Sequence, residues 1–85
     1  MRENWQGNPV WNYLKAHGLT PCQLAIASGC DYNVPYNVLN GYVKRLPRPI
    51  VDCVDTLDGD GEGDKLDKAY QVYRDGLSHH LLMKA

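Results

Sequence analysis

Apolar residues recur at α-helical spacing in five segments of the chain, and no segment shows the alternation of apolar and polar residues typical of a β-strand. The first helix is predicted to begin at Pro9, because Asn8 can cap it and proline suits the first helical position. Gly18 is predicted to end this helix in a left-handed conformation. Its apolar stripe consists of Val10, Trp11 and Leu14.

The second segment has the clearest boundaries. Thr20 and Gln23 have the spacing of a capping box, and Pro21 takes the first helical position between them. Ser28 and Gly29 are typical of a helix end, so this helix is predicted to be short, about two turns long.

Polar, turn-like residues over 30–34 separate the second helix from a third, which is predicted to run from about Pro35 to Arg45. Pro47 and Pro49 interrupt the chain after it. The residues expected to face inward from the third helix are Val38, Leu39, Tyr42 and Val43.

Two further helices are predicted, over 49–57 and from about Asp64 to Asp75, with the acidic, glycine-rich residues 58–64 as a solvated connector. The apolar face of the fourth helix consists of Ile50, Cys53, Val54 and Leu57. That of the fifth consists of Leu66, Ala69, Tyr70 and Tyr73, and Leu77 would extend it. Residues 78–85 would form a further helical turn or a tail. The pattern therefore predicts an all-α fold, a compact bundle of about five short helices.

The second and third helices have the arrangement of a helix-turn-helix unit. Ala25 is a small residue four positions before Gly29, where the two helices of such a unit cross closely. Glycine permits the positive φ that the turn requires. The expected apolar positions, six and nine residues after the glycine, are Pro35 and Val38 by direct count, which is a poor fit.

An expanded turn improves this fit. If four extra residues lie within 30–34, the two apolar positions become Leu39 and Tyr42, and Val34 becomes the apolar residue that follows the turn. The sequence therefore predicts a helix-turn-helix with an expanded turn.

With this alignment, three stretches together resemble the phage-repressor-like (Xre-type) helix-turn-helix family. They are Gln23-Leu24-Ala25, Asn37-Val38-Leu39-Asn40-Gly41-Tyr42 and Arg45-Leu46-Pro47-Arg48-Pro49. The resemblance covers residues 9–57 and implies that the third helix reads the major groove of duplex DNA. Carried over position by position, the base contacts are Tyr36, Asn37, Asn40, Gly41 and Lys44.

The chemistry of these residues suits base recognition, although bland alternatives stay open. Asparagine can bond bidentately to the adenine edge, and lysine can donate to guanine or phosphate. Gly41 would allow close approach to a base or backbone. Alternatively, Asn37 and Asn40 are merely solvated, and Tyr36 is a core residue.

Contacts to the DNA backbone are expected from Thr20, Gln23, Lys44, Arg45 and Arg48. The charge distribution supports this expectation. The whole chain has a net charge of −1, but residues 1–49 carry five bases against two acids, and residues 50–85 carry four bases against eight acids. A polyanion would be attracted to the first part and repelled by the second.

The chain is expected to form one small domain, with residues 1–57 as the helix-turn-helix core and 58–85 as an acidic linker and C-terminal helix. One such unit reads few base pairs, so a homodimer on a two-fold symmetric site is expected. The candidate dimer surface consists of Leu66, Tyr70 and Tyr73, which could instead complete the monomer core.

Composition excludes several other classes of protein. No apolar run suits a signal peptide or membrane span, and three cysteines without a CxxC pair suggest reduced thiols, so a cytoplasmic, nucleoid-associated protein is expected. Residues 58–69 begin like a calcium loop but lack its closing carboxylate, and His79 and His80 lack a ligand partner. No nucleophile and base are arranged for catalysis. We therefore expect no enzyme, metal, cofactor or small-molecule substrate.

The sequence thus predicts a DNA-binding transcriptional regulator, specifically a repressor from a phage or mobile element. The alternative is a protein-interaction module with the same fold, such as an antitoxin or accessory factor, that binds DNA weakly or not at all.

Overall fold

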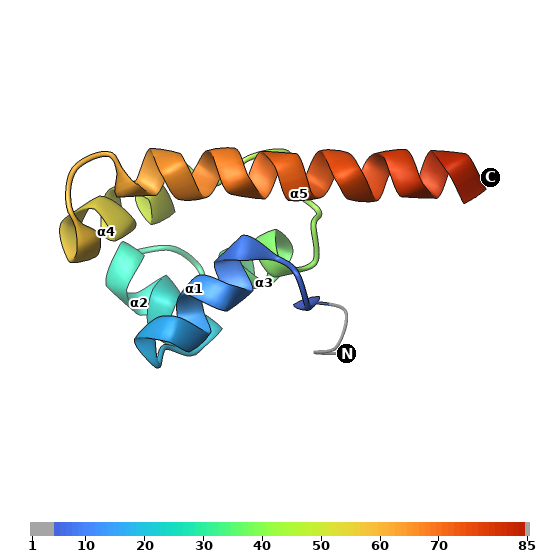
Figure 1. Ribbon diagram of the computed structural model, residues 1–85. Coiled ribbons are helices and arrows are strands. Elements are labelled where there is room, and N and C mark those ends of the chain that lie inside the picture. The colour runs from blue at the N-terminus through green and yellow to red at the C-terminus, as the bar shows by residue number, and fades with distance from the viewer. Residues whose placement is uncertain (1–4, 85) are drawn as a thin grey trace.

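The computed structural model describes the backbone of residues 5–84 and the side chains of residues 5–77. This part of the chain is helical and contains no strand, which confirms the all-α prediction. Its helices are α1 (Pro9–His17), α2 (Pro21–Ser28), α3 (Asn33–Leu39), α4 (Arg48–Asp58) and α5 (Glu62–Lys84). In Figure 1, α5 lies along one side of the other four helices, and its C-terminal part projects beyond them.

The predicted ends of α1 and α2 are confirmed. Asn8 accepts a hydrogen bond from the backbone N–H of Val10 at 2.9 Å, and Gly18 ends α1 at a φ of 65°. Thr20 Oγ1 accepts from Gln23 N at 3.1 Å, while Thr20 N donates to Gln23 Oε1 at 2.9 Å. These bonds satisfy backbone groups that helix ends leave without partners, so local sequence alone fixes both helices.

The core draws on all five helices and on Trp5, which precedes α1. Its fully buried side chains include Val10, Leu14, Leu24, Val38, Leu39, Ile50, Val54 and Tyr70. Asn8 is buried among them, and its Nδ2 donates to the carbonyl oxygens of Val38 at 3.3 Å and Leu39 at 3.1 Å. The start of α1 is therefore tied to the end of α3.

The predicted length of the third helix is wrong. α3 ends at Leu39 rather than near Arg45, and Gly41 then turns the chain at a φ of 76°. Tyr42, expected to face inward, is 72% exposed. The chain cannot continue as a helix through a left-handed residue, so residues 40–47 form a connection to α4.

The burial of α3 follows the direct count from Gly29. Pro35 and Val38, six and nine residues after this glycine, are both fully buried. Ala25 is buried where α2 faces α3, and four residues, 29–32, separate the two helices. Of the pair predicted from an expanded turn, Leu39 is buried, but Tyr42 is exposed and lies outside α3. Asp31 is not the cap of α3; the cap position is Tyr32, and no side-chain hydrogen bond is made there.

The acidic connector is shorter than predicted, because only residues 59–61 separate α4 from α5. Gly63 lies so close to α4 that a Cβ on it would collide with the Val51 carbonyl group. Its backbone N–H donates to Asp55 Oδ1 at 2.7 Å. Val51 is buried on α4, whereas Leu57, expected on the inward face, is exposed.

The candidate dimer residues of α5 belong to the monomer core. Tyr70 is completely buried, and its hydroxyl donates to the Val43 carbonyl oxygen at 2.7 Å. Leu66 and Tyr73 are partly buried against the same core. Tyr70 therefore cannot lie on a dimer surface, because packing inside its own subunit covers it.

Candidate nucleic-acid interface

The side of α3 that faces away from the core carries uncharged polar and aromatic residues. Asn33 and Asn37 are exposed, and Tyr32 at the start of the helix is 61% exposed. Tyr36 is half-buried. The one charged residue between Cys30 and Val43 is Asp31, so this face offers amides and hydroxyls rather than positive charge.

The five predicted base-contact residues occupy two different settings. Tyr36 and Asn37 lie on α3, whereas Asn40, Gly41 and Lys44 follow its end. The Asn40 side chain accepts a hydrogen bond from Trp5 Nε1 at 2.8 Å. The Gly41 carbonyl oxygen accepts from Arg74 Nε at 3.1 Å. Since Gly41 is a turn residue, it does not form part of a recognition helix.

Tyr36 is neither fully buried in the core nor fully exposed to solvent. Its ring centroid lies 5.9 Å from that of Trp5 and 6.2 Å from that of Tyr32. Half of the side chain therefore packs, and the rest borders an open cavity between α1 and α3.

Thr20 and Gln23 are exposed at the start of α2, but the capping box already uses their backbone N–H groups. The Thr20 hydroxyl hydrogen and the Gln23 amide nitrogen remain as donors for an outside acceptor. These two residues can thus contact phosphate through their side chains.

The basic cluster, defined as Lys44, Arg45 and Arg48, lies in the connection to α4 and at the start of that helix. Arg45 pairs with Asp67 at 3.4 Å and Arg48 with Asp52 at 3.2 Å. Both arginine side chains remain mostly exposed. Since Asp52 is exposed as well, the Arg48 pair is weak and an external phosphate can compete for Arg48, whereas the carboxylate that pairs with Arg45 is buried. Within the described residues, Lys44 makes no ion pair.

α5 fixes the shape of the segment that carries this cluster. Asp67 is buried, and its Oδ1 accepts from the backbone N–H of Leu46 at 2.8 Å. The bonds from Tyr70 to Val43 and from Arg74 to Gly41 hold the same segment. Three residues on one face of α5 therefore anchor residues 41–46.

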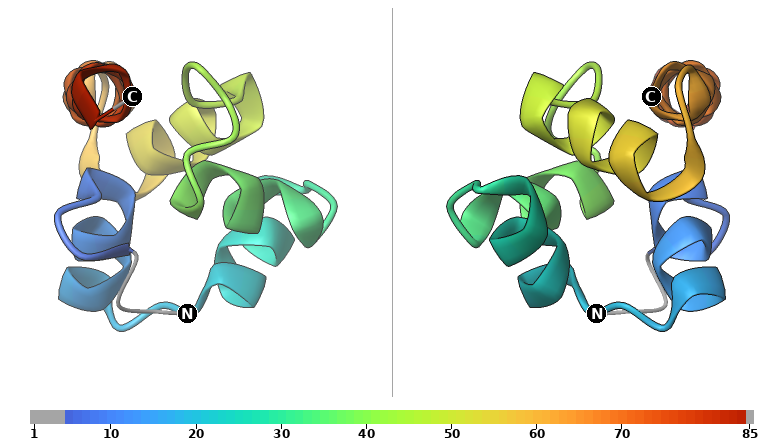
Figure 2. Two further views of the ribbon diagram at one scale, coloured as in Figure 1. Left: turned by 90° about the vertical axis from the view of Figure 1, so that its right-hand side faces the viewer. Right: turned by 90° about the vertical axis from the view of Figure 1, so that its left-hand side faces the viewer.

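Both views in Figure 2 show α3 between α2 and the connection 40–47. The candidate phosphate contacts consequently divide into two groups, one at the start of α2 and one in the connection to α4 and at the start of that helix. A helix in the major groove is flanked by the two DNA backbones, so this arrangement suits insertion of α3.

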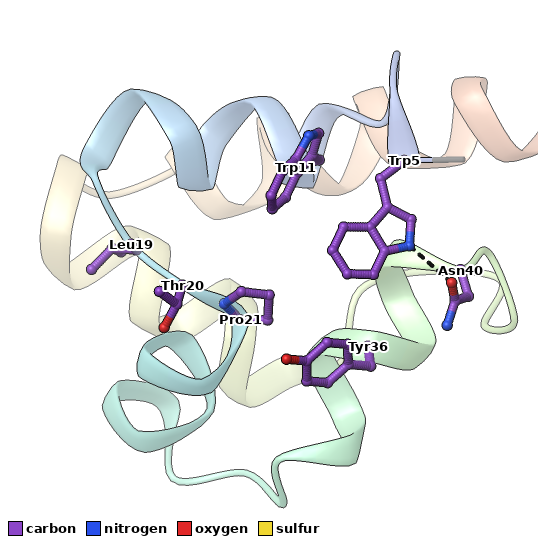
Figure 3. A pocket seen from close by; sticks show the side chains of 7 residues that line it. All are labelled: Trp5, Trp11, Leu19, Thr20, Pro21, Tyr36 and Asn40. Carbon is purple, nitrogen blue, oxygen red and sulfur yellow. Dashed lines mark hydrogen bonds between the residues drawn. The ribbon is translucent and has the colours of Figure 1, made fainter. Parts of the chain in front are cut away.

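Sequence reasoning placed Asn33 in the turn before the third helix, and it missed the aromatic cavity. Asn33 is the first residue of α3. The cavity has a volume of about 500 Å³ and is lined by Trp5, Trp11, Leu19, Thr20, Pro21, Tyr36 and Asn40 (Figure 3). No local signal indicated it, because Trp5 lies outside the predicted helices and reaches Tyr36 only through the tertiary fold.

The clearest electrostatic contact away from this surface joins α1 to the end of α4. His17 Nε2 lies 2.9 Å from Asp58 Oδ1, and His17 Nδ1 lies 3.0 Å from the Tyr13 carbonyl oxygen. The hydrogen bond to Asp58 raises the pKa of His17 above its usual 6.5. Burial, with the nearby Asp58 carboxylate, raises the pKa of Tyr13 to about 12.

Comparisons with protein-family models, with curated proteins and with solved structures yield no match to this chain. None of the described helices is both long and apolar enough to cross a membrane.

Proposed function

We propose that the chain is a transcriptional regulator that binds duplex DNA and inserts α3 into the major groove. The observation that supports this most strongly is the α2–α3 pair. Gly29 turns the chain at a φ of 75°, Ala25 is buried beneath the turn, and α3 displays Asn33 and Asn37 to solvent. The resemblance of residues 9–57 to Xre-type repressors rests on an alignment with an expanded turn, whereas α3 follows the direct count from Gly29.

Different residues take different roles in the proposed complex. Asn33 and Asn37 are the candidates for base contacts, because an exposed amide can pair with an adenine edge in the major groove. The basic cluster, with Thr20 and Gln23, holds the DNA backbone. Phosphate contacts of this kind set the position of α3 and contribute most of the salt dependence.

A homodimer and the role of a repressor from a phage or mobile element are the finer parts of the proposal. Two copies are required for a long enough site, since one unit reads only a few base pairs. Because Tyr70 is inside the monomer, we assign the dimer contact to the part of α5 that projects beyond the other helices in Figure 1. Val72 is 71% exposed on α5.

The proposal is tested by measuring binding to random duplex DNA over a range of salt concentrations. The logarithm of the binding constant should fall linearly with the logarithm of salt, by roughly 0.9 for each phosphate contacted. Neutralising the basic cluster as K44Q/R45Q/R48Q should abolish binding at moderate salt. The control is K65Q/K68Q, which removes positive charge from α5. Salt-independent binding, or equal loss in both variants, would contradict the proposal.

Selection of bound sequences from a random duplex pool then tests sequence specificity and the dimer together. A palindromic consensus is expected, with half-sites about one helical turn apart. A pool without enrichment would contradict specific recognition.

The second candidate function is a protein-interaction module, and one observation favours it. Ile26 on α2 is 76% exposed, Tyr32 is 61% exposed, and the start of α3 offers no positive charge to DNA. Exposed side chains with apolar surface close to α3 suit contact with another protein. Absence of DNA binding at low salt, together with capture of a defined partner that I26S/Y32S abolishes, would favour this function.

A further inference from the structure

The cavity between α1, the start of α2 and α3 is built mainly from aromatic rings. Trp11 and Tyr36 lie on opposite sides of it, and Trp5 closes one end (Figure 3). The centroids of Trp5 and Trp11 are 5.0 Å apart in an edge-to-face arrangement. At about 500 Å³ the cavity falls within the size range of small-molecule sites.

One polar group in this cavity has a fixed orientation. The Asn40 side-chain oxygen accepts the indole N–H of Trp5 at 2.8 Å, which distinguishes its oxygen from its nitrogen. Trp5 is itself buried, so it holds the amide rigidly. Within the described residues the Asn40 amide nitrogen has no partner, and its oxygen retains a second lone pair. The amide thus presents a donor and an acceptor side by side.

The other walls define the chemistry of an occupant. None of the lining residues within the described part of the chain is charged, so the cavity suits a neutral ring rather than an ion. Indole and phenol rings stack well on planar heteroaromatic groups. The hydroxyls of Thr20 and Tyr36 add hydrogen-bonding groups at the border. The Lys15 amine lies 5.8 Å from the centre of the Trp11 ring and places a positive charge close by.

We propose that this cavity binds a purine base with a donor and an acceptor on one edge, as in adenine. The base stacks between the aromatic walls, and the Asn40 amide pairs with its edge, as asparagine pairs with adenine elsewhere. Two sources carry this chemistry, a free nucleoside or nucleotide and an unstacked adenine of a nucleic acid.

This inference goes beyond the proposed function and does not require it. The cavity shares Thr20, Tyr36 and Asn40 with the surface expected to meet DNA. Occupancy by a free nucleoside should therefore weaken duplex binding, because both need the same side chains. Nucleoside binding and salt-dependent duplex binding are measured separately, so the failure of one leaves the other standing.

The test uses tryptophan fluorescence, because the chain's two tryptophans both line the cavity. Adenosine is titrated into the full chain, and a saturable change in emission is expected. Purine riboside, which lacks the exocyclic amino donor of adenosine and presents only acceptors, should bind more weakly. A proline-rich peptide serves as the competing occupant, and a saturable response to it alone would overturn the proposal.

Asn40→Asp is the sharpest variant. It keeps an oxygen for the Trp5 N–H, removes the amide donor and adds a negative charge, so adenosine binding should weaken roughly tenfold or more. Asn12→Asp is the matched control, because Asn12 is exposed on α1 next to Trp11 and does not line the cavity. It should bind adenosine as the parent chain does. Trp11→Leu should abolish the response of the remaining tryptophan, with helical content checked by circular dichroism.

Oligonucleotides separate the two sources of the base. Single-stranded oligo-dA that competes with adenosine, where oligo-dT does not, identifies an unstacked base of a nucleic acid. Adenosine binding without such competition identifies a free nucleoside or nucleotide. Absence of a saturable adenosine signal, or equal affinity in Asn40→Asp and the parent chain, would overturn the proposal.

Discussion

α2 and α3 form one structural unit, yet they are stabilised in different ways. α2 has a complete capping box at its start and a left-handed glycine at its end, all within residues 20–29. α3 is seven residues long, has no side-chain cap, and ends at Asn40 in a right-handed conformation. An isolated helix of seven or eight residues is not stable in water, so both helices depend on packing. The ends of α2 are specified by its own residues, whereas the end of α3 is held by residues far away in sequence.

The distant supports of α3 are few and specific. Asn8 donates to the last two carbonyl groups of α3, and the indole N–H of Trp5 donates to Asn40. Both residues precede α1. The exposed amides of α3 thus owe their position to residues about thirty positions upstream.

The largest expected effect on this contrast comes from Asn8→Ala. The variant loses the cap of α1 and both bonds to α3, and it leaves buried carbonyl groups without that donor, at a cost of about 3 kcal/mol in unfolding free energy. Urea denaturation measures this loss. Asn8→Ser keeps a capping oxygen but not the donor, so it should destabilise the protein less than Asn8→Ala does, by about 1 kcal/mol. Equal destabilisation by the two variants would mean that the whole effect comes from the lost hydrogen bonds to α3.

Thr20→Ala should have a smaller effect, because it removes only a local cap. The exposed capping box of α2 contributes about 1 kcal/mol, and Thr20→Ser should preserve most of it. The same denaturation experiment provides the comparison. If Thr20→Ala proves as costly as Asn8→Ala, α2 depends on more than its own sequence and the contrast fails.

Asp52→Asn addresses the charge beside α3 rather than its stability. The substitution frees Arg48 from its carboxylate partner and should strengthen binding to random duplex DNA by a few-fold, with a steeper salt dependence. Fluorescence anisotropy at several salt concentrations measures both. Asp60→Asn, on the turn between α4 and α5, removes the same charge without touching the basic cluster and serves as control. Equal gains in both variants would indicate net charge alone.

The smallest expected effect concerns the contact between His17 on α1 and Asp58 on α4. Because the pKa of His17 is raised in the folded state, its stabilisation is fully present below pH 6.5 and is lost as pH rises through the higher folded value. Unfolding free energy should therefore decline across that interval in the parent chain. In His17→Gln this decline should disappear, and its persistence would implicate another group.

The same contrast explains what could be predicted from the sequence. The caps of α1 and α2 are encoded by neighbouring residues, so Asn8, Gly18, Thr20 and Gly29 indicated their ends correctly. The end of α3 was predicted about six residues too late, because the helix ends before the left-handed Gly41, and the apolar residues around Gly41 favoured a longer helix. The direct count from Gly29 was right without extra turn residues. Pro35, which the sequence analysis judged a poor fit for a buried position, is fully buried.

The candidate site was predicted less well than the helices. Asn37, Lys44, Arg45 and Arg48 are exposed as expected, but Asn40 and Gly41 lie beyond the helix. The carboxylate partners of both arginines come from α4 and α5, and periodicity cannot reveal such tertiary pairs. The aromatic cavity was missed for the same reason.

The three anchors on α5 have a consequence for how the two oppositely charged parts of the chain cooperate. Asp67, Tyr70 and Arg74 lie on successive turns of one helix and meet the segment 41–46 in reverse order along the chain. The conformation of segment 41–46 therefore depends on residues of the acidic part. Any event that unwinds the middle of α5 would therefore release the three anchors of segment 41–46 together.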